Sequence, residues 1–165
     1  MRQLLLFAFL FLSVTATGQK KQITLEDLWK DGTFRIKSVP GFNAMKDGKR
    51  YTQIDEENGR KLINIYNLES GKKVKTVYDN SLKYDSDTVK IDEYAFSADE
   101  KQLLLYGESK NIYRRSILHK VYIYNTNSKT LQLLDKDKVL HASFSPDGTK
   151  VAYVKDNNIA TKRRG

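Results

Sequence analysis

The sequence contains no cysteine, so a disulfide, a thiol nucleophile and a cysteine-ligated metal are all excluded. It also lacks the short motifs that mark common enzyme sites: there is no Gly-x-Ser-x-Gly, no His-Glu-x-x-His, no Walker loop and no Gly-x-Gly-x-x-Gly. We therefore expect no self-contained catalytic set, no metal and no other cofactor in this chain. The fold must be held together by a packed core alone.

Long hydrophobic runs are also scarce, and the one at residues 4–12 is too short to span a bilayer stably. It follows a single positive charge and precedes the small residues Ala16 and Gly18, as in a secretory signal peptide. We predict a signal peptide over residues 1–18 and a mature domain over residues 19–165, exported to the periplasm or the extracellular space. An uncleaved N-terminal anchor is the alternative, and the absence of a lipobox cysteine argues against a lipoprotein.

No stripe of one charge sign is present, although the formal net charge is +9. Basic and acidic residues are interleaved along the chain, and part of the basic excess lies in the terminal cluster Lys162, Arg163 and Arg164. An exported protein also rarely meets nucleic acid. We therefore expect a solvated basic surface and no nucleic-acid partner.

What the sequence does contain is a repeat. Three turns align on Asp47, Asp99 and Asp147, which are 52 and 48 residues apart, and each turn leads into a strand. The strands after the second and third turns are apolar on successive residues, as expected where both faces of a sheet are covered. An aromatic-Ser pair precedes each of these two turns, at residues 96–97 and 144–145.

A second phrase, Ile-Tyr-Asn, occurs at residues 65–67 and 123–125, and a short turn and an alternating strand follow each copy. Each unit therefore holds about four antiparallel strands in roughly 50 residues, which is typical of β-propeller blades. A β-sandwich is the alternative, but its strands do not repeat one phrase at fixed intervals. We predict an all-β fold, a partial β-propeller of about two to three four-stranded antiparallel blades.

A short helix is expected before the first unit. Thr24 and Asp27 have the spacing of a capping box, which predicts a helix from about Thr24 to Lys30 that ends near Gly32. The stretch over residues 78–88 is polar, and we predict a loop there.

The number of units predicts a chain that continues. A closed propeller needs at least four blades, whereas the sequence shows about two and the opening strands of another. Residues 157–165 resemble the beginning of a further Ile-Tyr-Asn strand, with Ala160 where the pattern has an aromatic residue. We therefore expect the chain to be the front part of a longer protein.

The remaining candidates for chemistry are better explained by structure. His119 and His141 lie near strand starts without carboxylate or histidine neighbours at ligand spacing, so we expect blade-edge residues rather than metal ligands. Ser145 and Asp147 belong to the repeat and are expected to serve turn geometry, not a triad with His141. The ten Tyr and seven Phe could form a sugar-binding face, but their repeat-equivalent positions favour packing between blades.

One stretch, Tyr-Arg-Arg-Ser at residues 113–116, does not belong to the repeat and lies in the connection between two strands of a blade. Adjacent arginines in such a place are usually solvated surface. Together with the other phrases, however, it resembles the N-terminal propeller of the dipeptidyl peptidase IV family, in particular its exported Bacteroidetes-type members. The resemblance covers Ile23 to Ile159 and rests on "TLEDLW" (24–29), "FSADEKQLLLYGE" (96–108), "IYRRS" (112–116), "VYIYN" (121–125) and "FSPDGTKVAYVKDNNI" (144–159).

The resemblance implies a serine exopeptidase of the prolyl-oligopeptidase-like clan that removes dipeptides from free N-termini, with Pro or Ala preferred as the second residue. It implies that a hydrolase domain after the propeller carries the catalytic Ser, Asp and His, so this chain alone is expected to be inactive. Peptides with a free N-terminus are the implied partners, and a homodimer of the complete protein is compatible with the resemblance. The alternative is a non-enzymatic exported module that resembles TolB-type propellers and scaffolds other proteins.

The resemblance also implies that the propeller positions the substrate and gates access to the site. An arginine in an aromatic-Arg-basic-Ser loop is expected to hold the backbone carbonyl of the second substrate residue. A pair of glutamates on a later helical insertion is expected to hold the α-ammonium group. In this sequence Arg114 occupies the arginine position, with Arg115 as the neighbouring candidate, and the glutamate pair is absent.

Overall fold

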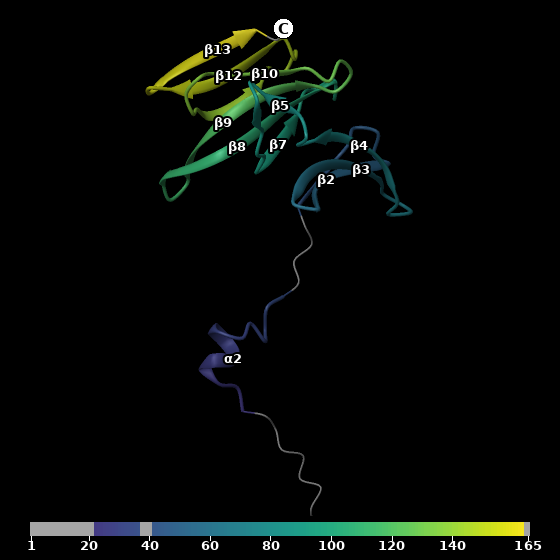
Figure 1. Ribbon diagram of the computed structural model, residues 1–165, viewed down its shortest axis with the longest axis vertical. Coiled ribbons are helices and arrows are strands. Elements are labelled where there is room, and N and C mark those ends of the chain that lie inside the picture. The colour runs from purple at the N-terminus through teal and green to yellow at the C-terminus, as the bar shows by residue number, and fades with distance from the viewer. Residues whose placement is uncertain (1–21, 37–40, 164–165) are drawn as a thin grey trace, which may run out of the picture. The chain divides into compact units, whose positions relative to one another are not determined.

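The computed structural model describes residues 22–36 and 41–163, which fall into two units (Figure 1). The signal peptide predicted over residues 1–18 lies outside the described residues. Within the part that is described, no helix combines the length and the apolar character needed to cross a membrane.

The described part of the N-terminal unit, residues 22–36, contains the short helix α2 (Leu25–Trp29). Thr24 is its N-cap: the Thr24 hydroxyl accepts a hydrogen bond from the Asp27 N–H at 3.2 Å, and the Asp27 carboxylate accepts one from the Thr24 N–H at 3.1 Å. This reciprocal pair is the capping box that the spacing predicted. Gly32 follows the helix with a φ of +61°, so the predicted helix and its end are confirmed.

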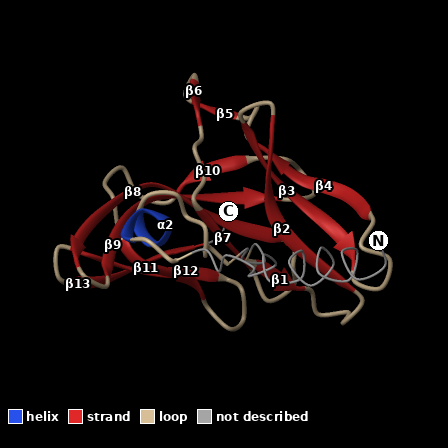
Figure 2. Cartoon of the chain, turned by 90° about the horizontal axis from the view of Figure 1, so that it is seen from below, coloured by secondary structure: helices blue, strands red, loops and turns tan. Residues whose placement is uncertain are grey.

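The second unit is built of antiparallel sheets whose strands follow one another in the chain (Figure 2). The first two sheets have four strands each and the third has three, while β5 and β6 form a separate two-stranded hairpin. The all-β fold of blade-like sheets is therefore confirmed. The strands are β1 (Phe42–Ala44), β2 (Arg50–Glu57), β3 (Arg60–Asn67) and β4 (Lys73–Asp79); β5 (Lys83–Tyr84) and β6 (Asp87–Thr88); β7 (Glu93–Phe96), β8 (Gln102–Tyr113), β9 (Ser116–Asn125) and β10 (Leu131–Leu133); and β11 (Leu140–Phe144), β12 (Lys150–Lys155) and β13 (Asn158–Arg163).

Each predicted Asp turn is present, and the three turns are built in the same way. The aspartate carboxylate accepts a hydrogen bond from the backbone N–H two residues later, over 2.9, 3.1 and 3.0 Å in chain order. The residue after the aspartate has a positive φ, which favours Gly. These pairs are Asp47-Gly48 (+64°), Asp99-Glu100 (+56°) and Asp147-Gly148 (+69°). The hydroxyl of Ser145 also donates to Asp147, so both residues serve the turn, as predicted.

The second sheet is the middle layer and has a hydrophobic core on each face. The successive leucines of β8 produce this arrangement: Leu103 and Leu105 belong to the core shared with the first sheet, and Leu104 to the core shared with the third. All three side chains are fully buried, which stabilises the fold by about 1.5–3 kcal/mol for each residue. The expected packing of aromatic residues between blades is confirmed for Tyr78, Tyr94, Tyr122, Tyr124 and Tyr153.

Residues 78–88 are more ordered than the predicted loop. Tyr78 belongs to β4, is 1 % exposed, and packs edge to face on Tyr124 with ring centroids 5.2 Å apart. The hairpin of β5 and β6 then closes through Asp85 and Ser86, both with positive φ. The prediction was wrong because it weighed the mean polarity of the segment, whereas one buried aromatic residue and a tight turn are enough to give it structure.

The strand expected to begin in residues 157–165 is β13, which pairs with β12 over six consecutive residues. Ala160, at the position where the repeat has an aromatic residue, lies opposite Tyr153. Among the described strands, none pairs with the other edge of β13.

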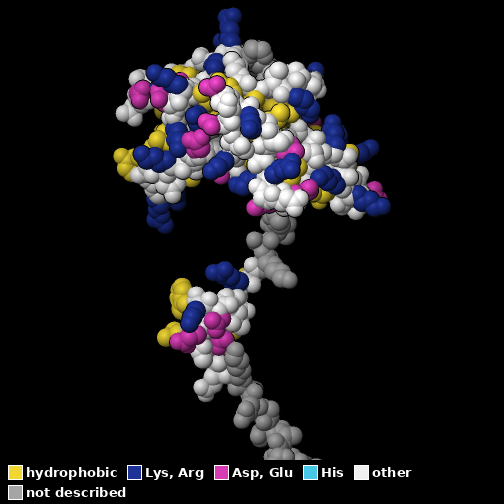
Figure 3. Space-filling model, in the orientation of Figure 1, with side chains coloured by type: hydrophobic (Ala, Val, Ile, Leu, Met, Phe, Trp, Pro, Cys, Tyr) yellow, Lys and Arg dark blue, Asp and Glu magenta, His cyan; other side chains and the backbone are white. Residues whose placement is uncertain are grey.

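The surface carries both charge signs. Figure 3 shows basic and acidic side chains interspersed over the visible face of the sheets rather than gathered into one stripe. This distribution agrees with the solvated surface expected from the sequence.

Candidate functional site

The Tyr-Arg-Arg-Ser stretch lies at the tip of a two-stranded arm, which we define as residues 108–119. β7 pairs with β8 only as far as Tyr106, whereas β8 and β9 continue to pair with each other up to Tyr113 and Ser116 (Figure 1). The two arginines between them are therefore the turn residues of a tight hairpin. The sequence placed them in a strand connection correctly, and the structure shows that β8 and β9 extend on either side of them beyond the rest of their sheet.

The arm leaves the sheet through a β-bulge. The register shifts between Gly107 and Lys110, and Glu108 has a φ of +47°. The backbone N–H and the hydroxyl of Ser109 both donate to the carboxylate of Asp92, over 3.3 and 2.5 Å. The hydrogen bond from the Ser109 hydroxyl lowers the pKa of Asp92, so this carboxylate is ionised at neutral pH.

The tip of the arm is held by no side-chain bond. Arg114 and Arg115 are exposed, and neither forms a hydrogen bond or ion pair with any residue that the structure describes. Three apolar side chains accompany them on the arm: Ile112, Tyr113 and Ile117 are 41 %, 77 % and 40 % exposed. The arm therefore presents free guanidinium groups and uncovered apolar surface side by side.

A hollow of about 280 Å³ lies beside the arm, and the two arginines differ in their relation to it. Arg115 is among the residues that line it, whereas Arg114 is not. The lining residues are Glu93, Tyr106, Arg115, Ile117, His119, His141 and Ala142. The hollow thus combines one guanidinium, one carboxylate and two imidazoles with the side chains of Tyr106, Ile117 and Ala142.

His119 and His141 meet in this hollow although 22 positions separate them in the chain. The backbone N–H and C=O of His119 both bond to Val139, over 3.0 and 2.8 Å, which brings β9 against the start of β11. The sequence spacing could not show this because the contact joins two blades. Within the described ranges, no group of three or more His, Asp and Glu side chains is arranged to hold a metal ion.

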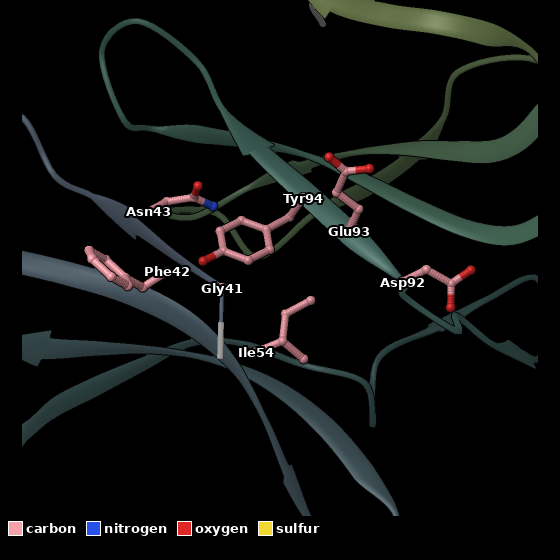
Figure 4. A pocket seen from close by; sticks show the side chains of 7 residues that line it. All are labelled: Gly41, Phe42, Asn43, Ile54, Asp92, Glu93 and Tyr94. Atoms are coloured by element: carbon pink, nitrogen blue, oxygen red, sulfur yellow. The ribbon is translucent and has the colours of Figure 1, made fainter. Parts of the chain in front are cut away.

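A second hollow, of about 370 Å³, lies between β1 and β7 (Figure 4). Its walls include the rings of Phe42 and Tyr94 and the carboxylates of Asp92 and Glu93. Asp92 is already engaged by Ser109, so Glu93 is the free acid here. Glu93 lines both hollows, and one carboxylate without a nucleophile does not make a catalytic set.

Comparison with known proteins extends the similarity beyond single motifs. The family described as "Dipeptidyl peptidase IV (DPP IV) N-terminal region" matches residues 97–163. The crystal structure of Porphyromonas gingivalis dipeptidyl peptidase 4 superimposes with a TM-score of 0.73 at 33% identity, covering 87% of this chain and 20% of that chain. The chain matches the N-terminal propeller region of the dipeptidyl peptidase IV family.

Curated relatives of the chain are also named as peptidases. Human prolyl endopeptidase FAP is 27% identical over 146 residues, which is 87% of this chain and 18% of the relative. Probable dipeptidyl-aminopeptidase B of Tuber melanosporum is 25% identical over 163 residues, 93% of this chain and 18% of the relative. The chain corresponds to the N-terminal propeller region of the family and spans about a fifth of the length of these relatives.

Sequence reasoning missed three residues at or beside the base of the arm: Asp92, Glu93 and Ser109. The acidic pair Asp92-Glu93 at the start of β7 and the break in the apolar run after Tyr106 were the available signals. Neither signal indicates that Asp92 and Ser109 are bonded, because that pairing depends on the bulge.

Proposed function

We propose that this chain is the substrate-positioning part of an exported dipeptidyl peptidase IV-like serine peptidase, which releases N-terminal dipeptides ending in Pro or Ala. In this proposal Arg114 holds the backbone carbonyl of the second substrate residue. The observation that supports it most directly is the free, exposed guanidinium at the end of a projecting arm. Export rests on the signal peptide predicted over residues 1–18.

The chemistry of Arg114 suits positioning and not bond cleavage. A guanidinium donating to a carbonyl contributes about 1.5–3 kcal/mol, because the bond is charge-assisted and the group cannot be deprotonated at neutral pH. Acyl transfer needs a nucleophile, a base and an oxyanion hole as well. The complete protein would supply these from outside the propeller, and the exposed apolar residues beside Arg114 would contact the peptide.

The test is steady-state hydrolysis of Gly-Pro-p-nitroanilide by the complete protein and its variants. Arg114→Ala should lower kcat/KM by about tenfold to a hundredfold, mainly through KM, since 1.4 kcal/mol corresponds to a factor of ten. Arg115→Ala is the matched control at the adjacent turn position and should have a much smaller effect. A sharp fall in the unfolding temperature of Arg114→Ala with normal activity per folded molecule would show that Arg114 is structural.

A further inference from the structure

The tip of the arm makes no side-chain bonds of its own, so its position must be set at the base. No described residue from 110 to 116 forms a side-chain hydrogen bond or ion pair. A two-stranded hairpin without such anchors is marginally ordered by itself. Whatever orders the base therefore decides where Arg114 is presented.

We infer that Asp92 is a positioning residue: through Ser109 and Lys61, it fixes the base of the arm so that Arg114 is held where a peptide substrate arrives. The inference rests on the proposed function of Arg114. Nothing in the role requires Asp92 to touch the substrate, because it acts through the direction of the hairpin.

The first step is the bulge, which frees Ser109 from the strand ladder. Between the pairs Gly107–Lys120 and Lys110–Leu118 the register shifts, and Ser109 has no partner residue on β9. Its backbone N–H and its hydroxyl instead converge on one oxygen of Asp92. A carboxylate thus takes the place of a strand partner at the point where the arm turns away from its sheet.

The second step ties this carboxylate to the first sheet. The Nζ atom of Lys61, on β3, lies 3.5 Å from Asp92 Oδ1 and donates to the Ile91 carbonyl at 2.7 Å. Both charged side chains are about two-fifths exposed, so the ion pair by itself is weak. Its effect is geometric, because it fixes which way the Asp92 carboxylate faces.

The third step concerns the segment that carries Asp92. A Cβ atom added to Gly107 would lie 1.8 Å from the carbonyl oxygen of Lys90, closer than atoms can approach. Only Gly allows the chain before Asp92 to run this close to β8. The backbone N–H of Asp92 then donates to the Tyr106 carbonyl at 2.7 Å, which fixes Asp92 to β8 just before the arm begins.

The fourth step braces the other strand of the arm. Nδ1 of His119, on β9, lies 3.3 Å from the Ser109 hydroxyl. Since the single hydroxyl proton of Ser109 goes to Asp92, its oxygen accepts from His119, and Nδ1 carries the proton. His119 is also bonded through its backbone to Val139, so the base is held from both the first and the third sheets.

The first measurement is amide hydrogen exchange over residues 110–118 in the wild type, Asp92→Ala and Ser109→Ala. Both variants should exchange at least about tenfold faster in the arm, because local opening loses its main restraint. Asp135→Ala is the matched control: this aspartate is also hydrogen-bonded and ion-paired, but it follows β10, and its partner is Lys155 of the third sheet rather than a residue of the arm. Unchanged exchange in the arm of both test variants would overturn the inference, whatever the activity.

The second measurement is a double-mutant cycle in the complete protein with Gly-Pro-p-nitroanilide. Asp92→Ala should raise KM by about tenfold with a smaller change in kcat, and this effect should disappear in an Arg114→Ala background. Additive effects of the two changes would overturn the positioning role, because Asp92 would then act elsewhere. If Arg114→Ala alone leaves kcat/KM unchanged, the proposed function is refuted instead. The hydrogen-exchange data would still show whether Asp92 and Ser109 order the arm.

Discussion

Tyr94 of the second sheet donates a hydrogen bond from its hydroxyl to Thr52 Oγ1 of the first sheet over 2.8 Å, and both residues are buried. The bond crosses the interface between two blades, and it lies beside the apolar core that the two sheets share. A buried hydroxyl needs a partner, so this pair fixes one relative placement of the two sheets in addition to stabilising it.

Tyr94→Phe should therefore lower the free energy of unfolding by about 0.5–1.5 kcal/mol, since Thr52 loses its donor while the ring still fills its place. The measurement is the midpoint of urea unfolding at constant slope. Tyr113→Phe is the control, because that ring is 77 % exposed and should leave the midpoint unchanged. Equal midpoints for wild type and Tyr94→Phe would show that the bond contributes nothing.

Gly107→Ala should be strongly destabilising for a steric reason. The added Cβ would meet the Lys90 carbonyl oxygen, a backbone atom that cannot move aside without displacing the chain up to Asp92. We expect a loss of about 1–3 kcal/mol and faster exchange in the arm. Gly41→Ala, where no atom lies within 4 Å of the new Cβ, should change the unfolding free energy by less than about 0.5 kcal/mol. A tolerated Gly107→Ala would contradict the close approach.

The ion pair that joins the second and third blades should make stability depend on pH. Lys155 of β12 donates to Asp135 at 2.8 Å, which lowers the pKa of Asp135 below its usual 3.8 and raises the pKa of Lys155. Between the lowered pKa of folded Asp135 and the usual value of 3.8, the unfolded chain binds more protons than the folded one. The contribution is therefore present above pH 3.8 and is lost as the pH falls through the folded pKa.

Asp135→Asn should consequently show a shallower loss of stability between pH 4 and pH 2 than the wild type. The measurement is thermal unfolding across that range. Lys73 and Glu57 form a pair at 3.2 Å within one blade, and Glu57→Gln serves as the comparison because that pair is more exposed than Lys155 and Asp135. Parallel curves for Asp135→Asn and the wild type would be the contrary result.

Local residue pattern predicted the parts of the fold that depend on neighbours in the chain. The Asp turns, the capping box and the double-sided burial of Leu103, Leu104 and Leu105 follow from residues a few positions apart. Even Glu100, which has the positive φ that Gly occupies in the other two turns, is identified by the repeat and not by its own preference.

The candidate site was only half predictable for the converse reason. The two arginines can be recognised because their motif has no counterpart in the other repeat units. The arm that carries them is exposed on both faces, so its sequence has no alternation of apolar and polar residues. Its anchor joins Ser109 to Asp92, 17 positions earlier, and to Lys61 on another blade. Contacts between separate sheets leave no periodic signal in one sequence.

The last prediction concerns the chain of 165 residues by itself, which should not hydrolyse Gly-Pro-p-nitroanilide. Ser109, His119 and Asp92 do lie together, yet in the wrong order for a triad: the serine stands between the acid and the imidazole. The Ser109 hydroxyl already donates its hydrogen bond to Asp92. The lowered pKa of Asp92 makes this carboxylate a poor base. Turnover above the buffer rate that disappeared in Ser109→Ala or Arg114→Ala would refute this, whereas residual turnover equal in all variants would indicate a contaminating peptidase.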